Sequence, residues 1–490
     1  MKNILFILCD QLRKDSLGCY GNPYAVTPHL DALAGRSTRF TRNYVVNPIC
    51  MPNRHSLFSG MYPRNHGVWT NGLLVPDCGD NLMHHLSKHG YQTASIGKIH
   101  FEPDGCSAEC GSMESEDLWQ KNPKMNDFHG PFWGFDYIEL ADRHHGTSGH
   151  MTEWFQKKGG TQEMYRTRCH PLDTQTGVDP VAEELHSSAF VGERMCHYLK
   201  HIRAQDKPFF AVASFPDPHH PFIVPESSAK RWAGRPTKEP VGSPEDLQGR
   251  PARYLQQFCG EWSRQGPKQA QHPHGLPNEL TQQRLEATYA MVEMIDTQIG
   301  NILQTLDELN LTKDTIIVFT SDHGELLGDF GLWTKGPFFF EGLVSTPLLI
   351  SVPECTNEKV NDCLFSAVDL VPTLCGLLGL PLPYYCDGID QSELWREGAK
   401  TPCRKACLIE YRNGYGAKDC NYKVLVTQQY KYGYSQLGEM ELTDLYHDPF
   451  EKVNQMNDAK YSAVSEEMLH LLMQELLKSE SKRPRQVSLA

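Results

Sequence analysis

The sequence contains no long uninterrupted run of apolar residues. A helix that crosses a bilayer needs about 20 predominantly apolar residues, and no stretch of the 490 residues provides them. The short apolar run Ile4–Leu8 is followed at once by Asp10, so it matches a buried strand better than the core of a signal peptide. We therefore expect a protein without membrane association and with a cytoplasmic location.

Dense clusters of basic residues are also scarce. The formal net charge is -13, and the one compact basic stretch is Lys482–Arg485. Binding to nucleic acid depends mainly on neutralising phosphates, so the sequence argues against nucleic acid as a partner. An anionic substrate would have to be attracted by a few basic groups within a pocket.

The 16 cysteines show no spacing that is diagnostic of a metal site. Cys106 and Cys110 are four residues apart, as are Cys403 and Cys407, but neither pair is accompanied by a second matching pair. A zinc site at either pair is therefore the less favoured interpretation. Since we expect a cytoplasmic protein, we predict free thiols.

Short apolar runs alternate with helical patterns along most of the chain. The runs are nearly continuous in apolar residues, as expected of strands that are buried on both faces, and comprise Ile4–Leu8, Thr93–Ile96, Phe209–Ser214, Thr315–Thr320 and Leu348–Val352. Gln282–Leu306 has apolar residues at helical spacing, and Asp369–Leu378 is a second helical segment that ends before Gly379. This order predicts an α/β fold with a large, mostly parallel sheet sandwiched by helices.

A change in the pattern of apolar and polar residues divides the chain into two parts. Residues 1–395 are predicted to form a catalytic α/β domain, with polar, irregular insertions near 106–184 and 225–277 that we expect to lie outside the core. Residues 396–490 are predicted to form a C-terminal α+β subdomain with an antiparallel sheet. Its elements are alternating segments and one amphipathic helix: Lys423–Thr427, Gln429–Tyr434, Glu441–Leu445 and Val464–Lys478.

Polar residues capable of chemistry follow four of the predicted strands. They are Asp10 and Gln11, then Lys98 and His100, then Asp217, His219 and His220, and finally Asp322 and His323. Because the carboxyl ends of strands form the binding crevice of an open α/β sheet, we expect these side chains to converge. Each has a structural alternative, such as an aspartate that only caps a helix. Their joint occurrence at strand ends favours a functional site.

The residue types in this set indicate metal-assisted chemistry on an anion. Asp10, Gln11 and Asp322 offer oxygen ligands and His323 offers a nitrogen, a set that suits Ca²⁺, Mn²⁺ or Mg²⁺. Positive charge for an anionic group would come from Arg54, Lys98, His100, His219 and Lys335. A metal flanked by cations stabilises charge on a phosphoryl or sulfuryl oxygen.

A specific resemblance begins at Cys50. The segment Cys50-Met51-Pro52-Asn53-Arg54 resembles the Cys-x-Pro-x-Arg core of the sulfatase family, which belongs to the alkaline-phosphatase-like superfamily. Further segments resemble the family in the same order: Asp10-Gln11, Gly97-Lys98-Ile99-His100, Pro218-His219-His220-Pro221, Ser321-Asp322-His323-Gly324, Thr334-Lys335-Gly336 and Leu442–Asn454. The resemblance spans nearly the whole chain and is closest to the choline-sulfatase-like and phosphonate monoester hydrolase branches.

The resemblance implies a sulfatase mechanism. A formylglycine-generating enzyme would oxidise Cys50 to an aldehyde, whose hydrated form, a gem-diol beside a metal ion, attacks the sulfur of a sulfate ester and later releases sulfate. The implied metal ligands are Asp10, Gln11, Cys50, Asp322 and His323, with Ca²⁺ preferred over Mn²⁺ or Mg²⁺. The remaining implied roles are charge stabilisation, proton transfer and substrate contact, filled by Arg54, Lys98, His100, His219, Lys335 and Asn71.

Several alternatives remain open at the level of sequence. Gln11 and His323 stand where many sulfatases carry Asp and Asn, and this resembles the branch that cleaves phosphonate monoesters or phosphodiesters. A non-catalytic binder of sulfated ligands, with Cys50 as a plain buried thiol, is the third interpretation. The substrate would be a small-molecule or saccharide sulfate ester, and the resemblance allows a homo-oligomer. Arg143 and the adjacent His144-His145 are either contacts to a sugar or ordinary surface residues, and the surface is the favoured interpretation.

Overall fold

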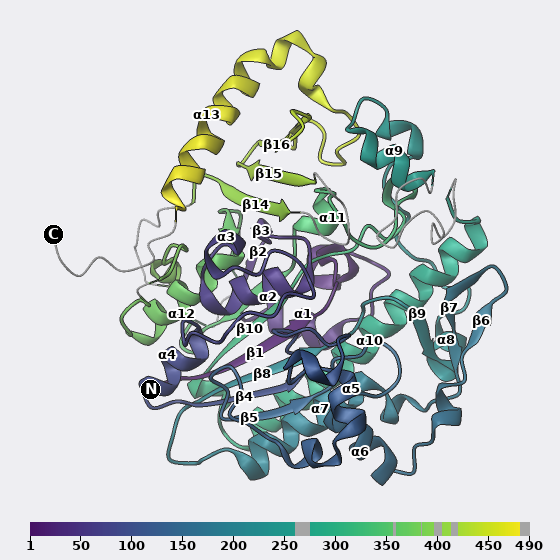
Figure 1. Cartoon of the computed structure of the whole chain (residues 1–490), viewed down its shortest axis with the longest axis vertical. Helices are drawn as coiled ribbons and strands as arrows, with labels where there is room; N and C mark the ends of the chain where they lie inside the picture. The colour runs from purple at the N-terminus through teal and green to yellow at the C-terminus, as the bar shows by residue number, and fades with distance from the viewer. Residues whose placement is uncertain (260–274, 356–358, 384, 396–403, 413–419, 481–490) are drawn as a thin grey trace.

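The computed structural model describes residues 1–259, 275–355, 359–383, 385–395, 404–412 and 420–480. Its centre is an eight-stranded sheet (Figure 1) with the strand order β12-β2-β11-β10-β1-β8-β4-β5. The strands of this sheet are β1 (Asn3–Cys9), β2 (Thr38–Phe40), β4 (Gln92–Gly97), β5 (Tyr137–Leu140), β8 (Phe209–Phe215), β10 (Thr315–Ser321), β11 (Leu348–Ser351) and β12 (Lys359–Asn361). All five strands predicted from the sequence are therefore confirmed.

The sheet is mostly parallel, as predicted. β1 lies in the middle and pairs in parallel with β10 and β8, while β11 pairs antiparallel with β10 and β2. A parallel return needs a crossover, usually a helix. The connection between β10 and β11 contains only the four-residue helix α11 (Glu341–Val344) besides loops and one turn of 3₁₀ helix, so it carries no such crossover.

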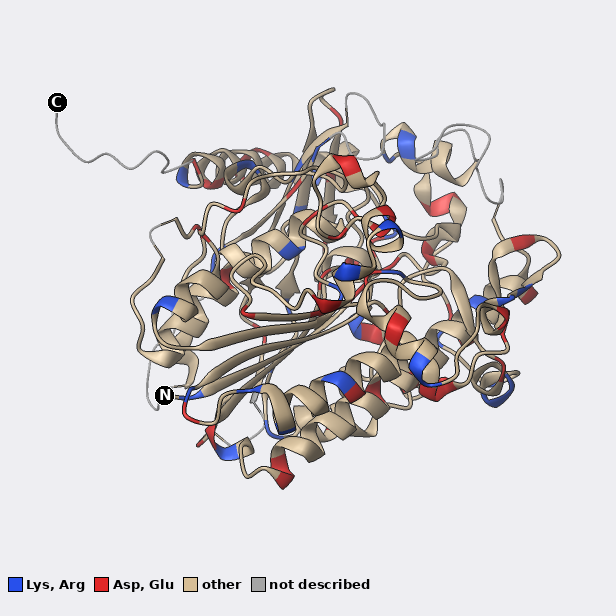
Figure 2. Ribbon diagram, turned by 60° about the horizontal axis from the view of Figure 1, so that its bottom comes forward, with Lys and Arg blue, Asp and Glu red and all other residues tan. Residues whose placement is uncertain are grey.

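Helices cover both faces of the sheet (Figure 1). Alternate residues of β1 point to opposite faces, and all of them are buried, so each face packs against helices. Leu5 and Ile7 belong to a core that includes residues of α1 (Pro28–Ala34), α6 (His150–Lys157), α7 (Ser187–His197) and α10 (Asn278–Glu308). Ile4 and Phe6 belong to the core on the other face, with α2 (Cys50–Ser59), α4 (Leu82–Lys88) and α12 (Leu370–Leu378). Both predicted helices are confirmed, as α10 and α12. The central strands in Figure 2 run largely uncharged between helices that carry charges of both signs.

The C-terminal segment adds a second, antiparallel sheet. Its strands are β14 (Cys407–Arg412), β15 (Asn421–Val426), β16 (Tyr430–Ser435) and β17 (Met440–Asp444), followed by α13 (Ser462–Lys478). The three predicted strands and the helix are confirmed, and β14 is additional. Tyr432 and Met468 share one hydrophobic core with Leu370. The boundary predicted at residue 396 lies outside the described residues and stays a prediction.

The expectation that both insertions lie outside the core is wrong. Within 106–184, β5 joins the main sheet beside β4, and Phe135 and Ile138 are buried in its core. Within 225–277, Trp232 and Tyr254 are each 1% exposed. The strands and helices of these stretches are short and leave little periodic signal among polar residues, so composition concealed them. The remaining elements are β3 (Asn43–Tyr44), β6 (Arg168–His170), β7 (Asp173–Asp179), β9 (Phe222–Pro225), β13 (Phe365–Ser366), α3 (Pro63–His66), α5 (Glu116–Lys121), α8 (Glu226–Trp232) and α9 (Ala252–Phe258).

The prediction of free thiols is wrong for Cys106 and Cys110, which form a disulfide. A short 3₁₀ helix ends at Cys110 and folds the segment back, so the two Cα atoms lie 6.3 Å apart. These sulfurs are therefore not zinc ligands. Cys363 is also disulfide-bonded, whereas Cys50 is not part of a disulfide. Cys403 lies outside the described residues. None of the helices in the described ranges is long and apolar enough to cross a membrane.

Candidate active site

Cys50 is the first residue of α2, where the helix dipole places partial positive charge. Every residue of this helix is buried. Asn71 lies beside its first turn: its Oδ1 accepts a hydrogen bond from the Met51 N–H at 3.1 Å, and its Nδ2 lies 3.9 Å from the Cys50 sulfur. The sequence thus places a cysteine sulfur at the positive end of a buried helix, next to an amide that contacts the same turn.

The pairing of β1 with β10 brings Asp10 and Asp322 together. Cys9 and Ser321 are register partners at the ends of these strands, so the residues that follow them emerge side by side. The Asp322 N–H donates to the Cys9 carbonyl at 3.1 Å. One potential ligand atom each from Asp10, Cys50, Asp322 and His323 lies within 4.8 Å of the others, and all four residues are buried. The predicted convergence is confirmed for these residues.

The donor atoms of this cluster fit a divalent cation. Oδ1 of Asp10 and Oε1 of Gln11 are buried and accept no hydrogen bond from the described part of the chain. Because a carbonyl only accepts, the Nδ1–H of His323 donates to the Gly324 oxygen at 2.8 Å, which leaves Nε2 with a lone pair. This Nε2 lies 3.5 Å from Oδ1 of Asp10 and 3.7 Å from Oδ1 of Asp322. Carboxylate and amide oxygens with one imidazole suit Ca²⁺, Mg²⁺ or Mn²⁺.

Two cations flank the carboxylates on one side. Nε of Arg54 donates to Oδ2 of Asp322 at 2.6 Å, and its Nη1 donates to the Ser214 hydroxyl at 3.0 Å. Nζ of Lys98 lies 2.6 Å from Oδ2 of Asp10. Burial alone would raise the pKa of Asp10, but Lys98 and Lys335 outweigh it and hold that pKa well below its usual range. Both carboxylates thus lie beside buried positive charge.

Lys335 occupies the centre of the site. Its Nζ lies 2.8 Å from the Cys50 sulfur, 2.9 Å from Nε2 of His219 and 2.9 Å from Nε2 of His323. Burial and Asp10 raise the pKa of the Cys50 thiol, but Lys335 and Lys98 outweigh them and lower that pKa well below its usual range. The position of Cys50 therefore favours negative charge on whatever atom replaces or extends its sulfur.

His100 and Gln11 stand somewhat apart from these contacts. The His100 N–H donates to the buried Glu114, and its Nδ1 is buried without a hydrogen-bond partner in the described chain. The side-chain nitrogen Nε2 of Gln11 donates to the Glu325 carboxylate and lies 2.9 Å from Nδ1 of His220. These contacts use the side-chain nitrogen of Gln11 and leave its Oε1 as an acceptor without a donor in the described chain. The assignment of His100 to proton transfer stays a prediction.

Sequence reasoning missed several residues of this site. Nδ2 of Asn53 donates to the Asp322 backbone carbonyl at 2.5 Å, and the Ser214 hydroxyl accepts from Nη1 of Arg54. His144 was expected at the surface, yet its Nε2 accepts from Nζ of Lys98 at 2.9 Å. The motif series already contained Asn53 inside the Cys50–Arg54 segment. His144, by contrast, lies in the loop after β5, which was itself not predicted, so no sequence signal placed it.

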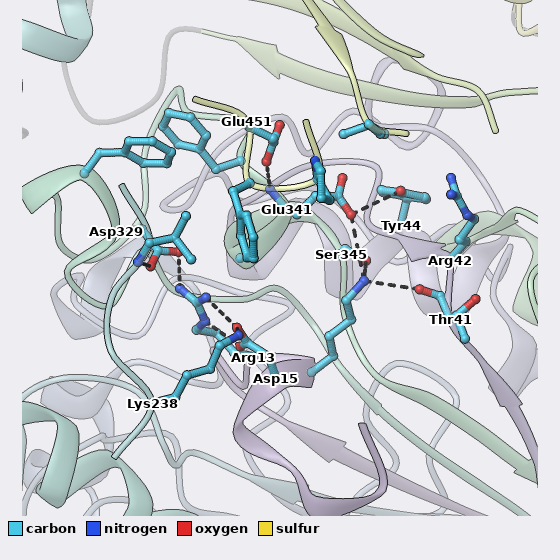
Figure 3. A pocket seen from close by; sticks show the side chains of 18 residues that line it. Arg13, Asp15, Thr41, Arg42, Tyr44, Lys238, Asp329, Glu341, Ser345 and Glu451 are labelled. Carbon is cyan, nitrogen blue, oxygen red and sulfur yellow. Dashed lines mark hydrogen bonds and ion pairs between the residues drawn. The ribbon is translucent and has the colours of Figure 1, made fainter. Parts of the chain in front are cut away.

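A cavity of about 390 Å³ (Figure 3) is lined by residues other than those of the cluster. Arg13 borders it and donates to the carbonyls of Glu325 and Leu326 at 3.1 and 2.9 Å. Its guanidinium also pairs with Asp15 and Asp329. The charges that Figure 3 shows around Arg13 are thus matched to one another. Arg13 thus holds the backbone at Glu325 and Leu326, and no residue of the cluster lines this cavity.

Comparison with known proteins agrees with this geometry. A family model described as "Sulfatase" matches residues 2–380, and one described as "N-sulphoglucosamine sulphohydrolase, C-terminal" matches residues 328–479. An arylsulfatase from Clostridium perfringens is 27% identical, with 97% of this chain and 94% of the relative covered. A choline-sulfatase from Rhizobium meliloti is also 27% identical, covering 92% of this chain and 82% of the relative.

A solved structure supports the same assignment. The phosphonate monoester hydrolase of Agrobacterium radiobacter superposes with a TM-score of 0.82 at 26% identity, covering 100% of this chain and 98% of that one. The match therefore includes the C-terminal sheet as well as the main one. With a family model that covers most of the chain and with relatives of matching length, the chain belongs to the sulfatase family and is a sulfuric ester hydrolase.

Proposed function

We propose that this sulfatase depends on formylglycine made from Cys50. The observation that carries the proposal is the position of the Cys50 sulfur, 2.8 Å from Nζ of Lys335 and 3.4 Å from Nε2 of His323, at the start of a buried helix. A plain thiol in a protein core has apolar neighbours and no role for charge. This one is surrounded by groups that bind an anion and a cation together. The oxidation would be carried out by a separate formylglycine-generating enzyme.

We further propose that Asp10, Gln11, Asp322 and His323 hold one divalent metal ion beside residue 50, with Ca²⁺ preferred and Mn²⁺ or Mg²⁺ as alternatives. The support is the pair of buried acceptors without hydrogen-bond donors in the described chain, Oδ1 of Asp10 and Oε1 of Gln11, together with the Nε2 lone pair of the buried His323 ring. When bound, the ion would supply Lewis-acid stabilisation of negative charge, and the hydrated aldehyde would supply the nucleophilic oxygen.

The side chains around residue 50 would bind the sulfate group, transfer protons and contact the substrate. Lys98 and Arg54 would bind the sulfate oxygens, because both carry buried positive charge next to the carboxylates. Lys335 would donate a proton to the leaving alcohol, directly or with His219, since their Nζ and Nε2 atoms are 2.9 Å apart. His100 would accept the proton that is lost when sulfate is released. Asn71 would contact the substrate from its place beside the first turn of α2.

We propose a small-molecule or saccharide sulfate ester as the substrate. Support for a saccharide comes from the second family model, whose description names an N-sulphoglucosamine sulphohydrolase. We also propose a cytoplasmic location, and assembly into a homo-oligomer is left to measurement of the mass in solution. Cell fractionation tests the location: recovery outside the cytoplasm would refute it.

Mass spectrometry of the native protein tests the first proposal. After digestion, the peptide that carries Cys50 should be lighter by ~18 Da, the difference between a thiol and an aldehyde. An unmodified thiol in protein from the native host, together with full activity of Cys50→Ala, would contradict the role of formylglycine.

A second candidate activity is cleavage of phosphonate monoesters or phosphodiesters. Gln11 and His323 favour it, as does the structural similarity to a phosphonate monoester hydrolase with a TM-score of 0.82. A panel containing 4-nitrophenyl sulfate, monosaccharide sulfates, 4-nitrophenyl phenylphosphonate and bis(4-nitrophenyl) phosphate separates the two. We expect the highest kcat/KM for a sulfate ester. A higher kcat/KM for either phosphorus ester would make the second activity the main one.

A further inference from the structure

The loop between β5 and α6 places an imidazole at the anion site. Nε2 of His144 accepts a hydrogen bond from Nζ of Lys98 at 2.9 Å. Its Nδ1–H donates to the Pro216 carbonyl at 3.1 Å. Because a carbonyl cannot donate, the second bond fixes the proton on Nδ1 and leaves Nε2 as the acceptor. His144 thus presents one defined tautomer to Lys98.

The same ring lies against a second histidine. The rings of His144 and His219 are nearly parallel, at 11°, with centroids 3.5 Å apart. His219 repeats the pattern of His144: its Nδ1 donates to the His220 carbonyl, and its Nε2 accepts from Nζ of Lys335 at 2.9 Å. Two stacked imidazoles therefore each hold the ammonium group of one lysine.

The electrostatic surroundings keep both rings as acceptors. Burial and the positive charge of Lys98 lower the pKa of His144 to about 3. Burial, His144 and His220 hold the pKa of His219 well below its usual range. A neutral ring adds no further positive charge beside two ammonium groups, and it retains the lone pair that orients each of them. This matters because Lys98 is also bound to Asp10, so its ammonium has acceptors on two sides.

We propose that His144 is a positioning residue that fixes the ammonium group of Lys98 and the ring of His219 where they meet the sulfate group of the substrate. The inference rests on the proposed roles of Lys98 and His219 in binding and proton transfer. The acceptor nitrogen Nε2 of His144, and not only the volume of its ring, is required for full activity. Without this acceptor, the Lys98 ammonium group would be oriented by Asp10 alone and would bind the sulfate group more weakly.

Two substitutions separate the acceptor from the ring. His144→Phe keeps a flat ring against His219 but removes the acceptor, whereas His144→Gln keeps an acceptor oxygen and removes the ring. We expect His144→Phe to lower kcat/KM for the best sulfate ester by ~10- to 100-fold, as is typical when a reacting group is misplaced by about 1 Å. His144→Gln should restore most of that loss.

The matched control is the neighbouring histidine. Nε2 of His145 lies 2.7 Å from Oδ2 of Asp179 and 3.1 Å from the Thr167 hydroxyl, in contacts that do not involve the lysines. His145→Phe should therefore leave kcat/KM unchanged. If His144→Phe matches the wild type while His144→Gln is impaired, His144 only fills space and the inference is overturned.

A binding measurement that needs no turnover completes the test. Inorganic sulfate should raise the melting temperature of the wild type and of His144→Gln, and should raise that of His144→Phe and Lys98→Met much less. An equal sulfate response of His144→Phe and the wild type overturns the inference, as does the lack of any response in the wild type. This readout does not require turnover, and mass spectrometry of the same samples shows whether residue 50 was converted to formylglycine.

Discussion

Arg54 and Asp322 form a buried ion pair, with Nε of the guanidinium 2.6 Å from Oδ2 of the carboxylate. The pair joins α2 to the loop after β10, and both side chains are no more than 1% exposed. It therefore fixes the carboxylate on one side of the proposed metal relative to residue 50. The remaining oxygen, Oδ1, accepts from the Gln11 N–H at 3.1 Å and lies 3.7 Å from His323.

Replacement of Arg54 by lysine should disable the site. Lysine keeps the charge but cannot place donors on Asp322, Ser214 and the Lys98 carbonyl at once. We expect kcat/KM to fall by at least ~10- to 100-fold, with a comparable loss of metal affinity, as for other residues that orient metal ligands. Arg143→Lys is the control, because Arg143 pairs with Glu116 near the surface. Equal activity of both variants would mean that charge alone is needed at position 54.

Removal of the proposed metal should lower both activity and thermal stability. Asp10 and Asp322 are buried carboxyl groups in the same cluster, and a cation bound between them would stabilise the folded state more as its affinity rises. We expect EDTA to lower the melting temperature of the wild type and Ca²⁺ to restore it. Asp10→Asn should show a much smaller difference between the two conditions. An EDTA effect of equal size in this variant would place the metal elsewhere.

Gly97 ends β4 and controls the approach of Lys98 to β8. Its φ is +100°, and an added Cβ would lie 1.9 Å from the Ser214 carbonyl oxygen. Gly90 also has positive φ, +87°, but a Cβ there would meet no atom within 4 Å. We expect Gly90→Ala to lower the free energy of unfolding by about 1–2 kcal/mol through φ alone. Gly97→Ala should cost more, ~3 kcal/mol or above, because the two strands must separate.

Chemical denaturation measures both glycine variants. The difference between them isolates the close contact of β4 with β8, since both positions share the backbone cost. Similar losses in the two variants would show that the strands move apart without penalty and that Ser214 does not fix the position of Lys98.

The pH dependence of stability should carry a contribution from Asp296. This residue of α10 accepts hydrogen bonds from the N–H groups of His29 and Leu30 at the start of α1. Burial raises its pKa to about 6. The unfolded value is about 4, so between these values the folded state binds more protons. Stability from this group is therefore full below about pH 4 and is lost as the pH rises to about 6.

Comparison with Asp296→Asn reveals this contribution, because the other carboxyl groups titrate in both proteins. We expect the wild type to gain stability relative to the variant as the pH falls from about 7 to about 4. Denaturation midpoints for the two proteins that stay a constant distance apart over this range would show that Asp296 titrates normally.

The sequence alone determined the scaffold and the chemistry of the site. Apolar runs such as Ile4–Leu8 and Thr315–Thr320 are strands because few other conformations bury so many consecutive β-branched and apolar residues. Since parallel strands end at a common edge, the residues after them had to meet there, and Asp10 and Asp322 do. The series of motifs around Cys50 and Arg54 then indicated the family, which the comparisons confirm.

Only the tertiary structure decided which residues complete the site. His144 follows β5, a four-residue strand in a polar insertion, and its contact with Lys98 depends on where that strand joins the sheet. Its neighbour His145 pairs with Asp179 in a different contact. Two adjacent histidines of identical sequence character thus have different surroundings. Periodicity and motif spacing describe local structure, whereas these contacts join residues far apart in the chain, so the fold had to bring them together before their roles could be distinguished.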